Sequence, residues 1–547
     1  MNILLTAINA KYIHSNLAVY SLRACAGEYR DAVELAEYTI NNQKDYILEE
    51  LYKRKPDVLC FSCYIWNIDY VTDIAREYKK LCPSVPIWVG GPEVSYEVEA
   101  FLQENPYIDG VMIGEGEDTF RELCGYYAHK RKLSDIAGIA FRKNSTGNST
   151  SVNNIGGNKA GEIVFTSPRP IKNMSEIPFC YDTLDDFSNR IIYYESSRGC
   201  PFSCSYCLSS VDKTLRFRDT EIVKRELKFF IDQKVPQIKF VDRTFNCNHA
   251  HAMELWRFIK ANDNGVTNFH FEISADLLNQ EELELISDMR PGLIQLEIGV
   301  QSTNEVTIKE IHRTMKLERL KEVVRLIQSG NNIHEHLDLI AGLPYEDYDS
   351  FGRSFDEIYE LKPNQLQLGF LKVLKGSYMF EHAAEYGIVY HDKPPYEVMS
   401  TKWLSFDDVI KIKRVEDMLE VYYNSGQFEI TMKLMECIFD SAFEFFQELG
   451  DFYEANGYFG MSHSRIRRCE ILLEFLALYL HGCDSDAMTS VVLSENAGDR
   501  NNTDFDENAQ LYNMIQESLI FDLYYRENCK SRPRWATDIG SFKHMTH

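Results

Sequence analysis

Residues 195–207 near the middle of the chain, ESSRGCPFSCSYC, are the stretch from which the rest of the sequence can be interpreted. Three of its residues are cysteines: Cys200, Cys204 and Cys207. The preceding run 191–194 (IIYY) is apolar and aromatic, which predicts a short buried strand, and the glycine and proline that follow end it. We therefore expect three thiols on one loop at a strand end, a place that usually carries function in an α/β scaffold.

The spacing Cys-x3-Cys-x2-Cys suits an iron–sulfur cluster. Three thiolates can each hold one iron of a [4Fe-4S] cluster, which leaves the fourth iron without a protein ligand and open to chemistry. A structural zinc site would need a fourth ligand at a characteristic spacing, usually in a second short Cys/His cluster, and none follows. Zinc and unliganded core cysteines remain the alternatives.

With the aromatic Tyr206 just before the last cysteine, this motif resembles the signature of the radical S-adenosylmethionine (SAM) superfamily. The resemblance implies that the amino and carboxylate groups of SAM chelate the open iron. It also implies that an electron from the cluster cleaves SAM to a 5′-deoxyadenosyl radical.

Length and charge limit the possible functions. A chain of 547 residues is too long for one core and predicts about three to four domains of ~150 residues. With 58 Lys and Arg against 83 Asp and Glu, the formal net charge is -25, so extended nucleic-acid binding is not expected. No window approaches the ~20 apolar residues of a membrane span. The start MNILL also lacks the basic region of a signal peptide, so we expect a soluble, cytoplasmic protein.

The 14 cysteines are scattered through a large chain, which favours reduced thiols over a disulfide scaffold. A cluster that is labile to oxygen would then require a reducing, anaerobic cell.

Short apolar runs alternate with amphipathic stretches in the first quarter of the chain. The runs are 3–7, 33–36, 58–62, 87–90 and 111–114, and residues 71–81 predict a helix. This alternation predicts a doubly wound parallel sheet, in which ligands bind beyond the carboxyl ends of the strands. The residues at those ends are His14, Ser62, Gly90, Gly91 and Glu115. Glycines there let a ligand approach the backbone, although a glycine turn is also an ordinary connection.

Upstream of a radical SAM motif, this region resembles the flavodoxin-like cobalamin-binding domain of many members of that superfamily, and we assign it residues 1–140. The resemblance implies that the loops after the first, third and fourth strands surround the nucleotide tail of cobalamin. Residues 12–17 (YIHSNL) lack the Asp and Gly of the usual Asp-x-His-x-x-Gly pattern. The Asp normally orients the histidine that binds cobalt, so its absence leaves three roles open for His14. His14 ligates cobalt, caps the following helix or lines the pocket.

A polar segment separates this region from the cysteine motif. Residues 143–162 are rich in Gly, Asn and Ser and predict a mobile surface loop at the tip of a hairpin formed by 139–142 and 163–165. We assign a linker to residues 141–184 and the catalytic domain to 185–400.

After the cysteines the alternation resumes. Candidate strands are 237–242, 269–273, 293–300 and 336–340, with helices such as 222–233 and 320–327 between them. These units predict a parallel sheet with its site at the carboxyl ends. The resemblance implies a partial (β/α)6 radical SAM barrel.

Polar groups near those strand ends are candidates for holding SAM. In the superfamily, residues at places matching Glu272, Gln301 and Arg313 contact the ribose, amino and carboxylate groups of SAM. An arginine fork suits a carboxylate. The alternative is that Arg313 is an exposed helix residue, since the stretch around it is charged.

Two further motifs match the superfamily: residues 299–302 (GVQS) and 338–344 (DLIAGLP), the second of which implies that adenine lies against Ile340 and Gly342. Residues 240–245 (FVDRTF) replace the Gly-Gly-Glu of many relatives, so Asp242 is the candidate for the SAM amino group. The neighbouring Arg243 pairs with Asp242 or faces substrate.

Cys247 follows soon after, close to His249 and His251. It either donates to a substrate radical, serves as a ligand or is a buried thiol without a role.

The last third changes to a helical period. Residues 409–422, 429–449 and 464–479 carry apolar residues at three- and four-residue spacing, whereas the acidic residues 494–510 predict a loose loop. We assign residues 401–547 to a mainly helical domain. Its end resembles an uncharacterised domain family that follows the cobalamin-binding and radical SAM domains in other proteins. The C-terminal domain either closes over the active site or caps the barrel.

The sequence therefore predicts a cobalamin-dependent radical SAM enzyme with a [4Fe-4S] cluster, SAM and cobalamin as cofactors. Methyl transfer to an unactivated centre of a small molecule or peptide is the leading reaction, with flavodoxin or ferredoxin as electron donor. The alternatives are cyclisation or rearrangement without net methylation, methylthio transfer to RNA, and a cobalamin or iron–sulfur sensor without turnover.

Overall fold

The computed structural model of this chain describes residues 1–143, 162–187, 189–481, 503–526 and 533–536. The chain divides into two compact units. The first comprises Met1–Gly299, Ile308–Glu335 and Leu371–Met399, and the second comprises Val300–Thr307, His336–Phe370 and Ser400–His547. Nearly all of the polar loop predicted for 143–162 lies outside the described residues.

The first unit begins with a seven-stranded sheet in the order β2-β1-β3-β4-β5-β6-β7. Its strands are β1 (Ile3–Asn9), β2 (Val33–Thr39), β3 (Val58–Ser62), β4 (Ile87–Gly90), β5 (Gly110–Met112), β6 (Ile139–Arg142) and β7 (Ile163–Phe165). The first five are parallel, which confirms the predicted doubly wound sheet, whereas β6 and β7 continue it as an antiparallel hairpin.

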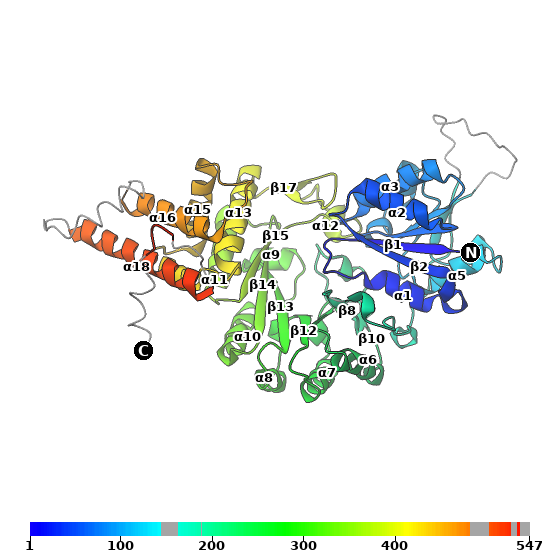
Figure 1. Ribbon diagram of the computed structural model, residues 1–547, viewed down its shortest axis with the longest axis horizontal. Helices are drawn as coiled ribbons and strands as arrows, with labels where there is room; N and C mark the ends of the chain where they lie inside the picture. Colours follow the sequence, from blue (N-terminus) through cyan, green and yellow to red (C-terminus); the bar gives the residue numbers. More distant parts are fainter. Residues whose placement is uncertain (144–161, 188, 482–502, 527–532, 537–547) are drawn as a thin grey trace. The chain divides into compact units, whose positions relative to one another are not determined.

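Helices cover both faces of this sheet. Helices α2 (Lys44–Arg54) and α3 (Ile68–Leu81) lie on one face, and α1 (Leu17–Cys25) and α5 (Glu117–Tyr127) lie on the other (Figure 1). Every residue of β1 is buried, as expected for a central parallel strand covered on both sides. The strand order reverses between β1 and β3, so a ligand crevice is expected where the loops after these two strands diverge.

The same unit continues into a second parallel sheet, in which β13, β12, β11 and β8 follow one another. The strands are β8 (Ile192–Tyr194), β11 (Gln237–Phe240), β12 (Asn268–Ile273) and β13 (Ile294–Gln301). The helices α6 (Thr220–Asp232), α7 (His249–Ala261) and α8 (Gln280–Ser287) connect them, and α10 (Leu317–Gly330) follows β13. All four strands coincide with predicted runs, which confirms the β/α alternation.

The segment Leu371–Met399 belongs to the first unit although its neighbours in sequence belong to the second. We call it the return segment. The hydroxyl of Tyr396 donates a hydrogen bond to Glu93 after β4, and the backbone amide of Met379 donates to the Ser205 carbonyl at 2.9 Å. The return segment thus contacts both the N-terminal sheet and the cysteine-bearing loop.

In the second unit, β14 (His334–Ala341), which starts in the first unit, pairs in parallel with β15 (Gln365–Phe370), a strand that was not predicted. Its helices include α11 (Tyr348–Tyr359), α13 (Phe406–Leu419), α14 (Glu429–Met435), α15 (Ala442–Ala455), α16 (Arg465–His481) and α18 (Thr503–Arg526). The predicted helical character is confirmed.

Two predictions in this unit are wrong in detail. The single helix expected over 429–449 is two helices, because Ser441 caps α15 through the Glu444 amide and also donates to Asp356 at 2.7 Å. Of the loose loop expected over 494–510, residues 494–502 lie outside the described residues, and the remainder is helical, since α18 begins at Thr503.

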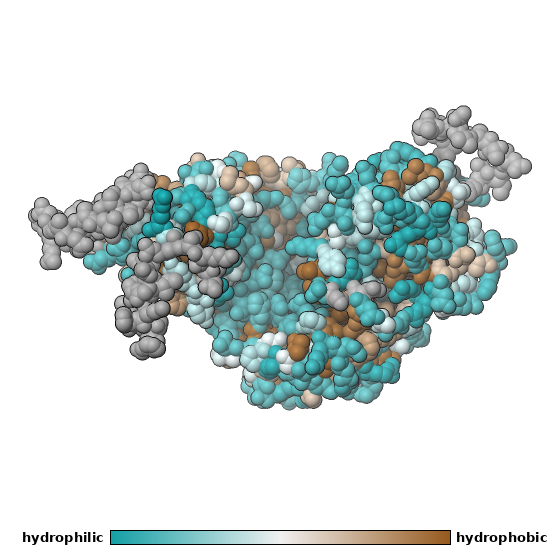
Figure 2. All heavy atoms as spheres, in the orientation of Figure 1, coloured by the Kyte–Doolittle hydropathy of each residue, from teal (hydrophilic) through white to brown (hydrophobic). Residues whose placement is uncertain are grey.

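Among the described residues, no helix is long and apolar enough to cross a membrane. The face drawn in Figure 2 is mainly hydrophilic, with hydrophobic residues in small groups, as the charge of -25 leads one to expect.

Candidate functional site

A hairpin holds the three cysteines. Strand β9 (Ser197–Arg198) pairs antiparallel with β10 (Arg216–Phe217), and the cysteines lie in the loop between them, which we call the cysteine loop. Gly199 opens this loop with φ 86°, and a Cβ there would lie 2.5 Å from the Thr214 carbonyl oxygen. The close approach of the two strands therefore requires glycine at this position.

The three thiols are free; Cys200 and Cys204 are buried and Cys207 is half-buried. Burial raises the pKa of Cys200, whose sulfur lies 3.8 Å from the Thr244 hydroxyl. In the described part of the chain, no three His, Cys, Asp or Glu side chains converge on one metal ion. A [4Fe-4S] cluster does not require this, since each thiolate binds a different iron, and three free thiols on one loop fit such a donor set.

Arg313 lies against the cysteine loop. Its Nη1 is 3.1 Å from the Tyr206 hydroxyl and 3.8 Å from the Cys204 sulfur, and its Nη2 donates to the Gly299 carbonyl. It is not on a helix. Burial lowers the pKa of Arg313, but the Tyr206 and Cys204 charges outweigh it and the pKa rises. Its buried Nε has no hydrogen-bond partner among the described residues, so one donor remains for a ligand.

Asp242 holds the start of the cysteine loop. Its carboxylate accepts hydrogen bonds from the Ser196 amide at 2.8 Å and from the Ser196 and Ser197 hydroxyls at 2.6 Å each. The Ser196 hydroxyl also lies 3.0 Å from Nε2 of His251, and burial raises the pKa of Asp242 to about 7. Since Asp242 is fully buried, this carboxylate faces the two serines and not an open site.

The other predicted SAM contacts fall in both units. Glu272 pairs in register with Glu297 on the neighbouring strand of the first unit. Gln301 ends β13 with φ 76°, and its buried Oε1 has no hydrogen-bond partner among the described residues. Half-buried Ile340 and buried Gly342 lie at the end of β14 and just after it, in the second unit. Their roles toward SAM remain predictions.

His14 is held between the N-terminal sheet and β8. Its Nδ1 lies 2.7 Å from the Tyr193 hydroxyl, and the Ile13 carbonyl accepts from the Ile191 amide at 2.8 Å. Burial, with the charges of Lys11 and Lys239, lowers the pKa of His14. The cap of α1 is Asn16, whose Oδ1 accepts from the Val19 amide, so His14 does not cap that helix.

The remaining predicted cobalamin contacts also follow strand ends. Ser62 is buried at the end of β3, where its hydroxyl accepts from Asn16 at 3.5 Å. Gly91 has φ 124°, and a Cβ there would lie 2.3 Å from the Cys63 carbonyl oxygen, whereas at Gly90 a Cβ would meet only Met112 at 3.4 Å. Gly91 is thus required by the packing of β4 against the loop after β3.

Glu115 belongs to an ion-pair network that the sequence did not suggest. It accepts from Arg216 at 2.7 Å, and it lies 3.6 Å from Arg198. Arg198 also contacts Glu117 at 2.5 Å and Glu195 at 2.9 Å. The loop after β5 is therefore tied to both strands of the cysteine hairpin. The sequence offers one indication of this network, a charged residue (Arg198) next to the cysteine motif, and that residue alone does not identify its ion-pair partners.

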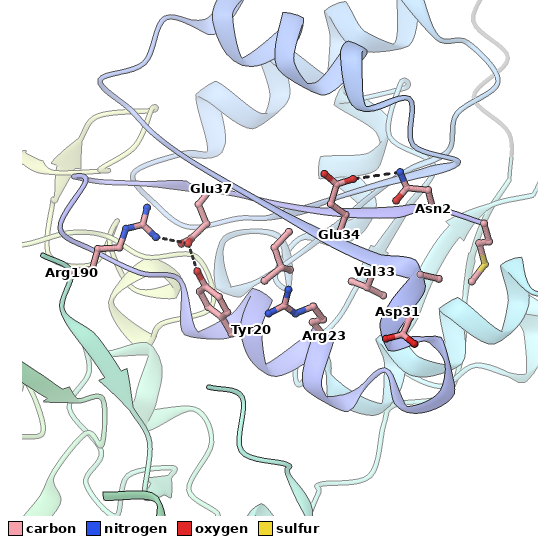
Figure 3. A pocket seen from close by; sticks show the side chains of 11 residues that line it. Asn2, Tyr20, Arg23, Asp31, Val33, Glu34, Glu37 and Arg190 are labelled. Carbon is pink, nitrogen blue, oxygen red and sulfur yellow. Dashed lines mark hydrogen bonds and ion pairs between the residues drawn. The ribbon is translucent and has the colours of Figure 1, made fainter. Parts of the chain in front are cut away.

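A surface cavity of about 710 Å³ lies beside β2, the edge strand (Figure 3). Its polar groups contact one another: Glu37 accepts from Arg190 at 2.6 Å and from the Tyr20 hydroxyl. None of the residues predicted to bind a cofactor lines it.

Family comparisons assign the parts of the chain. Residues 3–124 match the B12 binding domain, residues 194–358 match the radical SAM superfamily, and residues 384–546 match a protein family of unknown function (DUF4080). The chain therefore has the domain composition of the cobalamin-binding radical SAM enzymes.

Individual relatives agree with this composition. The chain is 27% identical, over 62% of its length and 49% of the other protein, to the cobalamin-dependent radical SAM methyltransferase TokK of Streptomyces tokunonensis, so it spans about half of that relative. It is 22% identical, over 62% of its length and 60% of the other, to the anaerobic magnesium-protoporphyrin IX monomethyl ester cyclase of Rubrivivax gelatinosus.

Among solved structures, the chain resembles the cobalamin-dependent SAM radical enzyme OxsB with aqua-cobalamin and SAM bound. The TM-score is 0.60 at 15% identity, covering 96% of this chain and 80% of that one. This likeness shows the shared fold.

Proposed function

We propose that this protein is a cobalamin-dependent radical SAM enzyme that transfers a methyl group to an unactivated carbon or phosphorus centre. One observation carries the proposal: within one compact unit, the loop after β1 touches β8, the strand that leads into the cysteine loop, through His14 and Tyr193. The two candidate cofactor loops therefore border the same strand. The domain matches and the methyltransferase relative support this function.

In this proposal Cys200, Cys204 and Cys207 hold the [4Fe-4S] cluster, and the bound cofactors supply the radical and the methyl group. Arg313 keeps a positive charge beside Cys204, which stabilises the negative charge of thiolates bound to iron. Asp242 and the serines it binds fix where the cysteine loop begins.

The remaining assignments are part of the same proposal. SAM contacts Tyr206, Asp242, Glu272, Gln301 and Arg313, with adenine beside Ile340 and Gly342. Cobalamin lies against His14, Ser62, Gly90, Gly91 and Glu115, and the domains span 1–140, 185–400 and 401–547 around the linker 141–184. Because Asp242 and Glu115 already have protein partners, their contacts with cofactors would require those partners to be exchanged or shared.

We further propose that the enzyme works in a reducing, anaerobic cytoplasm and receives electrons from a flavodoxin or ferredoxin. Free cysteines among the described residues and the need to keep a cluster intact support this setting.

The test is anaerobic reconstitution with iron, sulfide, cobalamin, SAM and a strong reductant. Formation of 5′-deoxyadenosine and S-adenosylhomocysteine in a ratio near one to one supports methyl transfer. Absence of both products, with and without cell extract as a source of substrate, would favour a sensor without turnover.

A second candidate is cyclisation or rearrangement without net methylation, which the similarity to the Rubrivivax gelatinosus cyclase favours. In that case 5′-deoxyadenosine forms without S-adenosylhomocysteine, and cobalamin is still required.

A further inference from the structure

Four polar side chains stand at one level across four strands of the first unit. Tyr193 of β8, Lys239 of β11, His270 of β12 and Gln295 of β13 are successive partners in the parallel register. Because partners in register point to the same face of a sheet, all four face the same side. We call these four residues the inner polar row.

The opposite face of these strands is apolar and covered by helices. Ile238, Phe269, Phe271 and Leu296 alternate with the row and are buried. The Phe271 ring lies 6.1 Å from the Trp256 ring of α7. The inner polar row therefore lies on the other face, and about a quarter of the Lys239 side chain (25%) is exposed there.

Glu297 joins two members of the row. Its Oε2 lies 3.0 Å from Lys239 Nζ and 3.0 Å from His270 Nε2. Burial works against ionisation of Glu297, but these two groups dominate and lower its pKa to about 2. Both contacts use Oε2, so Oε1 remains able to accept a hydrogen bond, and the ammonium of Lys239 has further N–H groups to donate.

The strands of the row contact both candidate cofactor loops. At one end, Tyr193 contacts His14 of the loop after β1. At the other end, the row member is Gln295 of β13, and four residues further along this strand Gly299 accepts from Arg313, which also contacts Cys204. The strands that carry the row therefore contact both loops, and this face is within reach of a molecule that reacts between them.

We infer that the inner polar row and Glu297 form the binding site for a polar substrate, which donates a hydrogen bond to Glu297 and accepts from Lys239 or His270. This inference rests on the proposed function. Amides, amino acids and hydroxylated rings offer such groups, whereas an unfunctionalised hydrocarbon or lipid tail would strip water from a charged pair and return no hydrogen bond. Closed (β/α)8 barrels fill the equivalent interior layers with branched apolar side chains.

The experiment uses the anaerobic holoprotein with cluster, cobalamin and SAM, incubated separately with the aqueous and the lipid fraction of an extract from cells that produce it. After gel filtration, retained compounds are identified by mass spectrometry. Glu297→Gln removes the charge but keeps the shape, and Lys239→Met removes the ammonium. Lys228→Met, which breaks an exposed pair with Asp232 on the outer helix α6, is the control.

We expect a retained compound from the aqueous fraction, with about 10- to 100-fold weaker retention by Glu297→Gln and Lys239→Met and unchanged retention by Lys228→Met. Cluster absorption and cobalamin content, measured on each sample, show whether a variant is still loaded. Retention only from the lipid fraction, equal retention by all variants, or no retention by a fully loaded wild-type protein would overturn the inference. Failure of the wild type to load either cofactor or to cleave SAM would instead count against the proposed function.

Discussion

The imidazole Nδ1 of His14 lies 2.7 Å from the hydroxyl of Tyr193, although the two residues are 179 positions apart. In metal-binding histidines, a partner on one ring nitrogen fixes the tautomer that leaves the other nitrogen available. Residues 12–17 lack the usual aspartate, and the partner that His14 has instead is Tyr193, on the strand before the cysteine loop.

We predict that Tyr193→Phe weakens cobalamin binding by about 10- to 100-fold and shifts the visible spectrum of bound cobalamin, because the His14 ring loses its partner. His14→Ala should have the same effect, and the double variant should add little. Tyr12→Phe, at a side chain that is 62% exposed, is the control. Normal binding by both Tyr193→Phe and His14→Ala would mean that His14 only lines the pocket.

Replacing Cys200, Cys204 or Cys207 by Ala should abolish the broad visible absorption of the reconstituted cluster. Cys247→Ala should retain it, because burial and the charge of Cys200 raise the pKa of Cys247 to about 11 and so disfavour the thiolate that would bind iron. The measurement is the iron content and visible absorbance of the four purified variants compared with the wild-type protein. Full absorbance in any of the first three would refute the ligand assignment.

The two adjacent glycines after β4 should respond differently to alanine. Gly91→Ala should reduce the free energy of unfolding by about 2 kcal/mol or more, because its φ of 124° and the 2.3 Å approach to the Cys63 carbonyl both oppose a Cβ. Gly90→Ala should be nearly neutral, since its Cβ would make an ordinary contact with Met112. Denaturant unfolding of both variants measures the difference, and equal destabilisation would contradict the prediction.

Arg198→Gln should destabilise the first unit by about 3 kcal/mol, because it leaves the buried carboxylate of Glu117 without its cation. The exposed pair between Lys130 and Glu28 offers a matched control, and Lys130→Gln should cause no measurable change. Hydrogen exchange should rise both after β5 and in the cysteine hairpin. A rise in hydrogen exchange in only one of these two regions would show that the ion-pair network does not couple the loop after β5 to the cysteine hairpin.

Asp242 should make stability depend on pH. Burial raises its pKa from 3.8 to about 7, so the native protein holds this proton more tightly than the unfolded chain does. The free energy of unfolding should therefore fall as pH rises between about 4 and 7, and then level off. Asp242→Asn should flatten this part of the profile, whereas Asp232→Asn on the surface of α6 should not. An unchanged slope in Asp242→Asn would assign the dependence to another group.

Local sequence pattern predicted most strands, because parallel strands covered by helices are continuous apolar runs such as 58–62. It missed β15, whose alternating QLQLGF sequence is only partly apolar. The cysteine loop was found from its spacing, but neither the Asp242 contacts nor the Arg198 network was. Those contacts include pairs of residues 45, 81 and 101 positions apart, and only the tertiary fold brings such residues together.

The return segment has a consequence for protein engineering. Because Leu371–Met399 runs back to contact Glu93 beyond β4 and Ser205 in the cysteine loop, the N-terminal domain is held in part by residues from far downstream. A chimaera that takes its first 140 residues from a relative would join a foreign sheet to a native return segment. Such an exchange should preserve the contacts only if both pieces are transplanted together.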